Sequence, residues 1–392
     1  MGELFANSAG STAYYASVVC YVAAALGCAY ALFGTTAARD FARSMAAAPP
    51  KSFPPVTILK PLHGAEPDLY AHLASFCLQD YPSPVQIVFG VADPADPSAA
   101  VVRRLVAEFP DRDLELVINP RRHGANAKVS NLINMQSEAR HELLIISDSD
   151  IAVPRDYLMT IAATLGQPGV GLVTCLYCGA VASGIWSRFS AAAIDYHFLP
   201  NVLIGLKLGL ATPCFGSTIA VTKTTLTKIG SLQSIADQLA DDYAMGTAVR
   251  RAGLKVAIPP FIVAHTCAER SLHELLLHEI RWARTIRAVD PLGYAGLAIT
   301  HAVPLALLGV ILGGLTPAAF ILALALACRF ALQAELRRLF NLHNGIFWFG
   351  PIRDVLSFAV FVASFLGRRV EWRGQRYGVK ADHTLAYYSE AD

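Results

Sequence analysis

The sequence predicts a doubly wound α/β domain with a mostly parallel sheet, joined to transmembrane helices. The 392 residues are 54% hydrophobic and only 16% charged, a balance typical of a globular domain combined with apolar membrane segments. Short apolar runs alternate with helix-like segments in the first half of the chain, and long apolar stretches lie near both ends. A formal net charge of +2, without a basic run interleaved with aromatics, argues against nucleic acid as a partner.

Residues 1–46 are predicted to form an N-terminal transmembrane helix and its flank. Thr12 to Gly34 is an uncharged stretch, long enough to cross a hydrocarbon core of about 30 Å as a helix. No Lys or Arg precedes it, which argues against a cleaved signal peptide. Arg39, Arg43 and Lys51 follow it, so the positive-inside rule predicts an external amino terminus and a cytoplasmic downstream domain.

Residues 47–290 are predicted to form the cytoplasmic α/β domain. Prolines between Ala47 and Pro55 indicate a linker. Four runs with the composition of strands follow, namely Val56–Leu59, Val85–Val91, Leu114–Ile118 and Leu143–Ser147. Near-continuous apolar strands separated by helices are typical of a parallel sheet that is buried on both faces.

Residues 291–392 are predicted to return to the membrane and to end in a basic tail. Runs that end at Leu315 and Leu332 are typical of a membrane hairpin, and a third run ends at Leu366. Arginines follow the second and third runs, so both flanks look cytoplasmic. Pro351, with Arg353 and Asp354 close by, favours an interfacial or re-entrant third segment over a simple span.

Acidic and basic side chains follow the predicted strands. Asp148 and Asp150 come directly after the fourth strand and Asp93 after the second. Because ligands of α/β sheets bind at the carboxyl ends of strands, the Asp-x-Asp pair is placed to hold Mg²⁺ or Mn²⁺ together with a diphosphate. A lone Asp-x-Asp is more often a surface turn. Lys128 begins a helix, where it can face an anionic phosphate or be solvated surface.

Two later segments have both a functional and a structural interpretation. Asp241 and Asp242 precede a predicted helix and can cap it. Arg281, Trp282 and Arg284 lie on a helix before the C-terminal membrane runs, where they can be interfacial anchors. Several other residues are interpreted as structural: the histidines His197 and His265, and the eight scattered cysteines, whose single CxxC pair, Cys175 and Cys178, is a poor metal signal.

The ordered set resembles the processive and lipid-directed inverting glycosyltransferases with the fold called GT-A, whose signature is three aspartate positions followed by (Gln/Arg)-x-x-Arg-Trp. From Val56 to about Ile286 the chain resembles the ceramide glucosyltransferase family. The stretches that carry this likeness are Leu59–Leu62, Asp80–Pro82, Asp96–Pro97, Gly124–Leu132 and Asp242–Tyr243. The residues of Pro213–Thr218, His265–Arg270 and Arg281–Arg287 most resemble the bacterial hopanoid-biosynthesis branch of this family. His278 departs from the pattern, since it occupies the place of Gln or Arg.

The resemblance implies a role for each matching position. Asp242 would be the general base with Asp241 beside it, and Asp148 with Asp150 would hold the metal. Residues implied to bind the nucleotide sugar are Lys60, Asp93, Lys128, Asp148, His278 and Arg281, of which Asp93 would hold the uridine. Residues implied to bind the acceptor are Gly216, Ser217 and Trp282. Arg281 and Trp282 would also close the catalytic site.

The resemblance also implies a reaction and a location. A UDP-sugar would donate N-acetylglucosamine or another hexose, with inversion, to a hopanoid polyol such as bacteriohopanetetrol, at a bacterial inner membrane. Glucosylation of ceramide from UDP-glucose is the alternative, and a catalytically inactive lipid-binding scaffold is the less favoured one. The sequence indicates no obligate protein partner.

Overall fold

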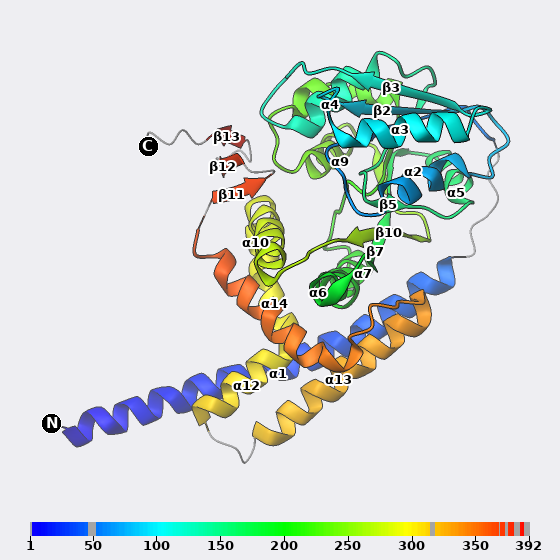
Figure 1. Cartoon of the computed structure of the whole chain (residues 1–392). Coiled ribbons are helices and arrows are strands. Elements are labelled where there is room, and N and C mark those ends of the chain that lie inside the picture. Colours follow the sequence, from blue (N-terminus) through cyan, green and yellow to red (C-terminus); the bar gives the residue numbers. More distant parts are fainter. Residues whose placement is uncertain are drawn as a thin grey trace.

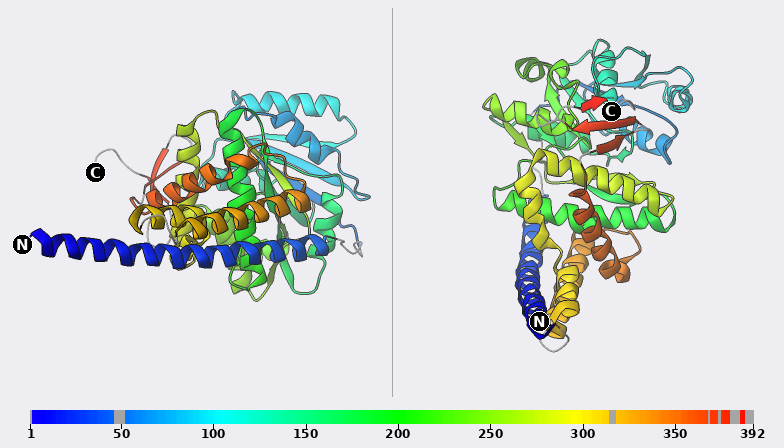
Figure 2. Two further views of the ribbon diagram at one scale, coloured as in Figure 1. Left: turned by 90° about the horizontal axis from the view of Figure 1, so that it is seen from below. Right: turned by 90° about the vertical axis from the view of Figure 1, so that its left-hand side faces the viewer.

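The computed structural model describes residues 2–45, 52–313, 318–367, 369–372, 375–379 and 385–387. Most of the predicted linker, with Lys51, lies outside these residues, as do Leu315, Arg368 and Arg373. An α/β domain occupies one end of the molecule and long helices the other, with α1 (Gly2–Ser44) projecting past the rest at its N-terminal end (Figures 1 and 2).

The main sheet of the described chain confirms the predicted parallel layer. Its seven strands lie in the order β3-β2-β1-β4-β8-β6-β9. Only β8 runs against its neighbours, β4 and β6, and the remaining pairs are parallel. The strands are β1 (Val56–Pro61), β2 (Val85–Val91), β3 (Asp113–Ile118), β4 (Leu143–Ile146), β6 (Val170–Thr174), β8 (Ile219–Thr222) and β9 (Lys255–Ala257). All four strands predicted from the sequence are present.

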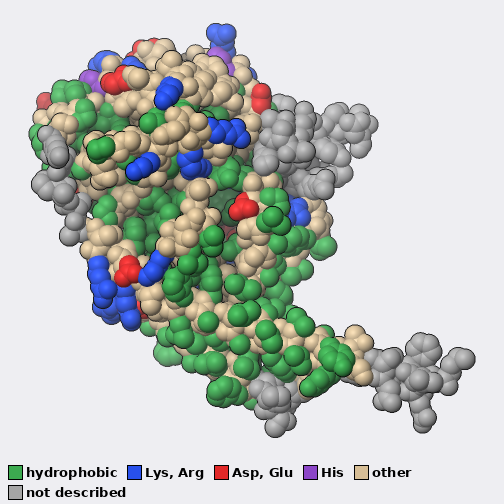
Figure 3. All heavy atoms as spheres, turned by 180° about the vertical axis from the view of Figure 1, so that it is seen from behind, with side chains coloured by type: hydrophobic (Ala, Val, Ile, Leu, Met, Phe, Trp, Pro, Cys, Tyr) green, Lys and Arg blue, Asp and Glu red, His purple; other side chains and the backbone are tan. Residues whose placement is uncertain are grey.

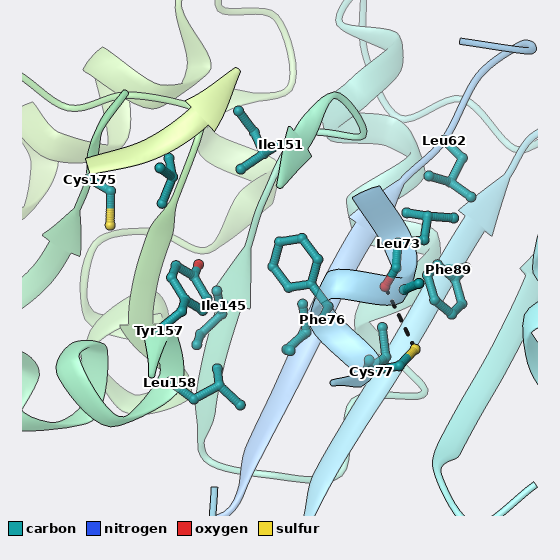
Figure 4. Close-up of a cluster of buried hydrophobic side chains, with 14 of the residues drawn as sticks. Leu62, Leu73, Phe76, Cys77, Phe89, Ile145, Ile151, Tyr157, Leu158 and Cys175 are labelled. Atoms are coloured by element: carbon teal, nitrogen blue, oxygen red, sulfur yellow. Dashed lines mark hydrogen bonds between the residues drawn. The ribbon is translucent and has the colours of Figure 1, made fainter. Parts of the chain in front are cut away.

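Helices bury both faces of this sheet. Ile58, Phe89 and Ile145 pack in one apolar cluster with helices α2, α3 and α5, which includes Phe76 and Tyr157 (Figure 4). The residues adjacent to them along the strands point to the opposite face and pack with α4 and α9. The helices are α2 (Leu69–Cys77), α3 (Pro97–Glu108), α4 (Ala127–Gln136), α5 (Tyr157–Leu165), α8 (Lys223–Lys228) and α9 (Asp241–Arg251), with a 3₁₀ turn at Leu232–Ile235.

A second, three-stranded sheet lies between the main sheet and the long helices (Figure 1). Its order is β5-β10-β7, with β10 parallel to β7 and antiparallel to β5. Helices α6, α7 and α10 flank it on the side of the long helices. The elements are β5 (Ile151–Ala152), β7 (Leu176–Val181), β10 (Ile262–Cys267), α6 (Gly184–Ala193), a π-helical turn (Ile194–Phe198), α7 (Leu199–Lys207) and α10 (Leu272–Val289).

The apolar helices form the other end of the molecule. Tyr21 of α1 packs against Gly309 of α12, and Arg39 of α1 pairs with Glu335 of α13, so α12 runs outward along α1 and α13 returns beside it. The elements are α1 (Gly2–Ser44), α11 (Pro291–Gly296), α12 (Ala302–Gly313), α13 (Ala318–Phe340), α14 (Gly350–Ser364) and 3₁₀ turns at Leu297–Thr300 and Phe347–Phe349. The strands β11 (Arg369–Trp372), β12 (Gln375–Val379) and β13 (Leu385–Tyr387) form a third sheet beside α10 (Figure 1).

Length and composition within the described residues confirm one N-terminal and two C-terminal apolar helices able to cross a membrane. These are Ser11–Ser44, Ala319–Phe340 and Phe347–Ser364, and a pair bent by 66°, Pro291–Thr300 with Ala302–Gly313, can add a fourth. The last helix packs against α10 of the α/β domain. Whether this helix crosses the membrane or follows an interfacial or re-entrant path stays a prediction. The membrane orientation and the domain boundaries also stay predictions.

Candidate active site

The predicted Asp-x-Asp pair lies at the carboxyl edge of the main sheet. Asp148 and Asp150 follow β4, whose neighbour β8 runs the other way and so brings the loop before it to the same edge. The Asp148 amide donates to the Gly216 carbonyl at 3.3 Å. The structure thus brings the predicted metal ligands beside the predicted acceptor loop.

Lys128 lies among the carboxylates. It occupies the first turn of α4, which Asn126 caps by accepting from the Val129 amide. Its Nζ is 2.7 Å from Asp148 Oδ1 and 3.4 Å from Asp241 Oδ2. Burial alone would lower the pKa of Lys128, but the two carboxylates together raise it well above its usual value. Lys128 is therefore a permanent cation at this edge, and its contact with phosphate stays a prediction.

Asp242 is half-buried, as are Asp148 and Asp150, whereas Asp241 is buried. Its Oδ2 accepts from the Gly216 amide at 2.9 Å and its Oδ1 from the Tyr243 amide at 2.7 Å. Burial, and then the charge of Asp241, raise the pKa of Asp242 to about 7. Ala240 occupies the N-cap position of α9, so neither aspartate is the capping residue. A carboxyl with this pKa can exchange a proton near neutrality.

Gly216 lies so close to the carboxylate cluster that a residue with a side chain would clash with it. A Cβ at this position would lie 2.6 Å from Asp148 Oδ2 and 2.9 Å from Lys128 Nζ. The missing side chain therefore lets the backbone close one wall of the carboxylate cluster. Ser217 is buried, and its hydroxyl donates to the Cys175 carbonyl at 2.9 Å. The acceptor contacts predicted for this loop stay predictions.

Asp150 faces a histidine that sequence reasoning had interpreted as structural. Asp150 Oδ1 is buried, lies 3.5 Å from His265 Nδ1 and makes no hydrogen bond. Burial would raise the pKa of Asp150, but His265 and, more weakly, Lys60 hold it well below its usual range. Val263, His265 and Cys267 are alternate positions of β10, and all three are buried. The period-two pattern of this strand is the sequence signal that could have placed His265 on the inward face.

Aromatic rings connect this carboxylate edge to α10. Tyr177 stacks on Phe198 with ring centres 4.6 Å apart and meets Trp282 edge-on at 6.4 Å. The His278 ring lies 4.5 Å from Trp282, and its Nδ1 is 2.5 Å from a Glu269 carboxylate oxygen. His278 and Trp282 therefore lie near the carboxylate edge, whereas a place for Arg281 in the site stays a prediction. Sequence reasoning missed Tyr177 and Glu269.

Two predicted nucleotide-sugar ligands occupy different surroundings. Lys60 is wholly buried, and its ammonium group donates to the Asp148 main-chain carbonyl and, at 3.3 Å, to Ser147 Oγ. Burial lowers the pKa of Lys60 to about 7. Lys60 therefore stabilises the backbone of the Asp-x-Asp loop from within the core. Asp93 is exposed beyond β2, where its Oδ1 accepts from the Ala95 amide at 2.8 Å. Contacts of either residue with a nucleotide stay predictions.

The family model described as "Glycosyl transferase family 21" matches residues 19–385. The chain belongs to glycosyl transferase family 21. It is 26% identical over 245 residues to ceramide glucosyltransferase 1 of Caenorhabditis elegans, covering 62% of this chain and 52% of the relative. It is 34% identical over 107 residues to the ceramide glucosyltransferase of Candida albicans, covering 24% and 20%. The chain spans about half the length of the Caenorhabditis relative.

Among solved structures, this family 21 chain resembles the mannosyltransferase PcManGT from Pyrobaculum calidifontis in complex with GDP-Man and Mn²⁺. The TM-score is 0.55 at 22% sequence identity, and the match covers 90% of this chain and 98% of the other. At this identity the likeness concerns the fold, and it confirms the GT-A class predicted from the sequence.

The carboxylates at the sheet edge of this family 21 chain fit a divalent cation that is shared with a ligand. The described part of the chain holds no group of three or more His, Cys, Asp or Glu side chains arranged around a metal position. Mg²⁺ is usually held by one or two carboxylates together with substrate phosphates and waters, so the pair Asp148 and Asp150 suffices. The buried Oδ1 of Asp150, which makes no hydrogen bond, is the observation in favour. All eight cysteines are free thiols in the structure.

Proposed function

We propose that this glycosyltransferase moves a sugar from a UDP-sugar to a hydroxyl of a membrane lipid, with inversion at the anomeric carbon. The observation that carries the proposal is the half-buried Asp242, held beside Asp148 and Lys128 at the carboxyl edge of the sheet. Apolar helices adjoin the same domain. A lipid leaves a bilayer at a cost of about 0.8 kcal/mol per CH₂, so its transferase benefits from a site at the membrane surface.

Asp242 is assigned the role of general base. The acceptor hydroxyl must lose its proton as its oxygen attacks the anomeric carbon, and a positioned carboxylate contributes about 10²- to 10⁴-fold. The proton passes to Asp242 while the new C–O bond forms and the bond from the anomeric carbon to the diphosphate oxygen breaks. The Gly216 and Tyr243 amides fix the orientation of the carboxylate. One displacement of this kind inverts the configuration.

The leaving diphosphate needs positive charge. Lys128 supplies it from the first turn of α4, where the helix terminus also favours an anion. Mg²⁺ or Mn²⁺ bound by Asp148 and Asp150 would supply additional charge to the same oxygens. Arg281 is assigned to the diphosphate and Trp282 to the acceptor side. The contact of His278 with Glu269 holds the His278 ring against Trp282 and so fixes this part of α10.

Two acceptors compete within this proposal. The names of the relatives support glucosylation of ceramide from UDP-glucose at least as well as the transfer of N-acetylglucosamine or a hexose to bacteriohopanetetrol. Both acceptors present a hydroxyl on an apolar body and make the same demand on Asp242. The proposed location is a bacterial inner membrane with the catalytic domain on the cytoplasmic side, where UDP-sugars are available.

The test is a product assay on the whole chain in detergent with Mg²⁺. UDP-glucose and UDP-N-acetylglucosamine are each offered with ceramide and with bacteriohopanetetrol, and lipid products are identified by mass spectrometry and NMR. A β-linked glycolipid from an α-linked donor supports the proposal and names the acceptor. An α-linked product contradicts inversion, and the absence of a lipid product from every pair contradicts lipid glycosylation.

A further inference from the structure

An apolar pocket lies at the end of the catalytic domain that adjoins α1. Its volume is about 380 Å³, within the range of small-molecule sites. Side chains from α1, α7, the loop after α7, α9 and the segment after β9 line it, among them Phe41, Leu206, Pro213, Arg250, Ile258 and Pro260. We propose that this pocket binds the apolar body of the acceptor lipid, an inference that rests on the proposed function and deepens it.

The pocket opens at the same sheet edge as the catalytic carboxylates. The strands there follow the order β4, β8, β6, β9, so at a spacing of about 4.8 Å the end of β9 lies about 14 Å from the end of β4. Arg250 is eight residues beyond Asp242 on α9, or about 12 Å along the helix. A lipid lying in the pocket can therefore direct a hydroxyl toward Asp242.

One loop belongs to both places. Ala211, Thr212 and Pro213 line the pocket, and Gly216, three residues later, is hydrogen-bonded to Asp242. Between them the loop packs tightly on α9, because a Cβ on Gly246 would lie 2.6 Å from the Cys214 Cβ. The pocket and the base thus share a rigid wall. Occupancy of the pocket can set the position of the acceptor hydroxyl.

The mouth of the pocket has the properties of a membrane-facing entrance. Phe41 and Ser44 belong to the end of α1, seven and ten residues past the uncharged stretch, or about 10 to 15 Å along the helix. Leu208 and Leu210, in the loop beside the pocket, are 52% and 78% exposed. Hydrophobic side chains cover much of the lower half of the face shown in Figure 3, apart from a group of charged side chains at its left edge. Exposed leucines next to a membrane helix indicate contact with lipid.

The chemistry of the lining selects the occupant. Phe41, Leu206, Pro213 and Ile258 offer hydrocarbon contacts, beside the polar side chains of Ser44, Thr212 and Arg250. Each buried CH₂ of an acyl chain or fused-ring lipid gains about 0.8 kcal/mol there. The α14 side of α10, by contrast, is filled by the buried pair Arg353–Glu279 at 2.6 Å. The pocket beside α1 is therefore the better position for the apolar body.

Photo-crosslinking tests the location without requiring turnover. The whole chain in detergent is irradiated with a hexadecanol that carries a diazirine at mid-chain, and labelled peptides are mapped by mass spectrometry. Labelling of residues 206–213 and of the end of α1, competed by the acceptor found in the product assay, supports the inference. Labelling confined to α10 and α14, or labelling competed equally by free detergent, overturns it and leaves the proposed function intact.

A matched pair of variants tests the consequence for the reaction. Thr212 lines the pocket and is exposed, so Thr212→Trp fills the space without disturbing the core; Thr227→Trp on exposed α8 is the control. We expect Thr212→Trp to raise KM for the lipid acceptor about tenfold while KM for the sugar donor stays within about twofold. Equal KM values for the lipid in both variants overturn the inference. A loss of donor binding in Thr212→Trp overturns it too, because the pocket would then serve the donor.

Discussion

Two buried ionic clusters of the molecule are built on opposite principles. Near the membrane helices, Arg329 of α13 donates from Nε to both oxygens of Asp354 of α14 at 2.9 Å. Its Nη1 donates to the Tyr196 carbonyl at 2.7 Å, and His197 lies 2.8 Å from Asp354. Both carboxylate oxygens of Asp354 are thus paired with a cation. Such a network is complete within the protein.

The carboxylate cluster at the sheet edge, which is the proposed catalytic site, is incomplete by comparison. Asp148, Asp241 and Asp242 crowd around Lys128, and Asp150 keeps a buried oxygen without a hydrogen bond. Crowding and burial raise the pKa of Asp148 and of Asp242, because the charged forms lack enough positive charge nearby. The difference indicates that the helix network serves the fold, whereas the carboxylate cluster leaves room for the cation and the proton that the proposed reaction requires.

The largest effect is expected from Asp242→Asn. An amide keeps an oxygen that can accept from the Gly216 amide but cannot take the acceptor proton. We expect kcat to fall about 10²- to 10⁴-fold while donor binding and the melting temperature hold. Product assays, isothermal titration with UDP and thermal unfolding measure the three quantities, with exposed Asp111→Asn as the control. An active Asp242→Asn enzyme would assign the base elsewhere, with Asp241 the first candidate.

The opposite result, a loss of stability with donor binding unchanged, is expected from Asp354→Asn in the helix network. Removing one partner of a buried ion pair leaves Arg329 uncompensated, which costs about 3–5 kcal/mol in comparable cases. We expect a lower unfolding temperature and a lower yield in detergent, with donor affinity unchanged in the protein that remains folded. A variant with wild-type stability would show that the network is not structural, and the contrast between the two clusters would fail.

Local patterns made much of the fold predictable. The strands that became β1 to β4 are apolar runs that need no knowledge of their neighbours. The Asp148 and Lys128 positions follow from a strand end and a helix start, which are local too. For the same reason, the doubly wound α/β class could be expected before any contact was known, whereas the GT-A assignment came from the resemblance to a known family.

Long-range pairing accounts for what the sequence did not reveal. Tyr177 and His265 face the carboxylates only because β7 and β10, far apart in the chain, pair in a second small sheet. Likewise, Asp354 lies 157 residues from His197, and a charge within an apolar run does not disclose its partner. The apolar pocket combines residues from 41 to 260, so no single motif could indicate it.

A divalent cation should stabilise the protein through the carboxylate cluster and not through the helix network. A ligand at a hundred times its dissociation constant stabilises the folded state by about 2.7 kcal/mol. We expect Mn²⁺ with UDP to raise the melting temperature of the wild type and of Asp354→Asn by similar amounts, and to leave Asp150→Asn unchanged. Thermal unfolding with and without chelator measures this. An undiminished rise in Asp150→Asn would remove Asp150 from the metal site.

The smallest effect concerns pH and the crowding of charge around Asp242. Its pKa of about 7 is above the ordinary carboxyl value, so the proton is favoured in the folded state. Stability from this group is therefore present at low pH and declines as pH rises toward 7. The base is the deprotonated form, so kcat/KM should fall about tenfold per unit below that pKa and level off above it. Asp241→Asn removes the neighbouring charge and should move this limb toward lower pH. A limb unmoved in Asp241→Asn would show that burial alone sets the pKa, and that crowding does not distinguish this cluster from the other.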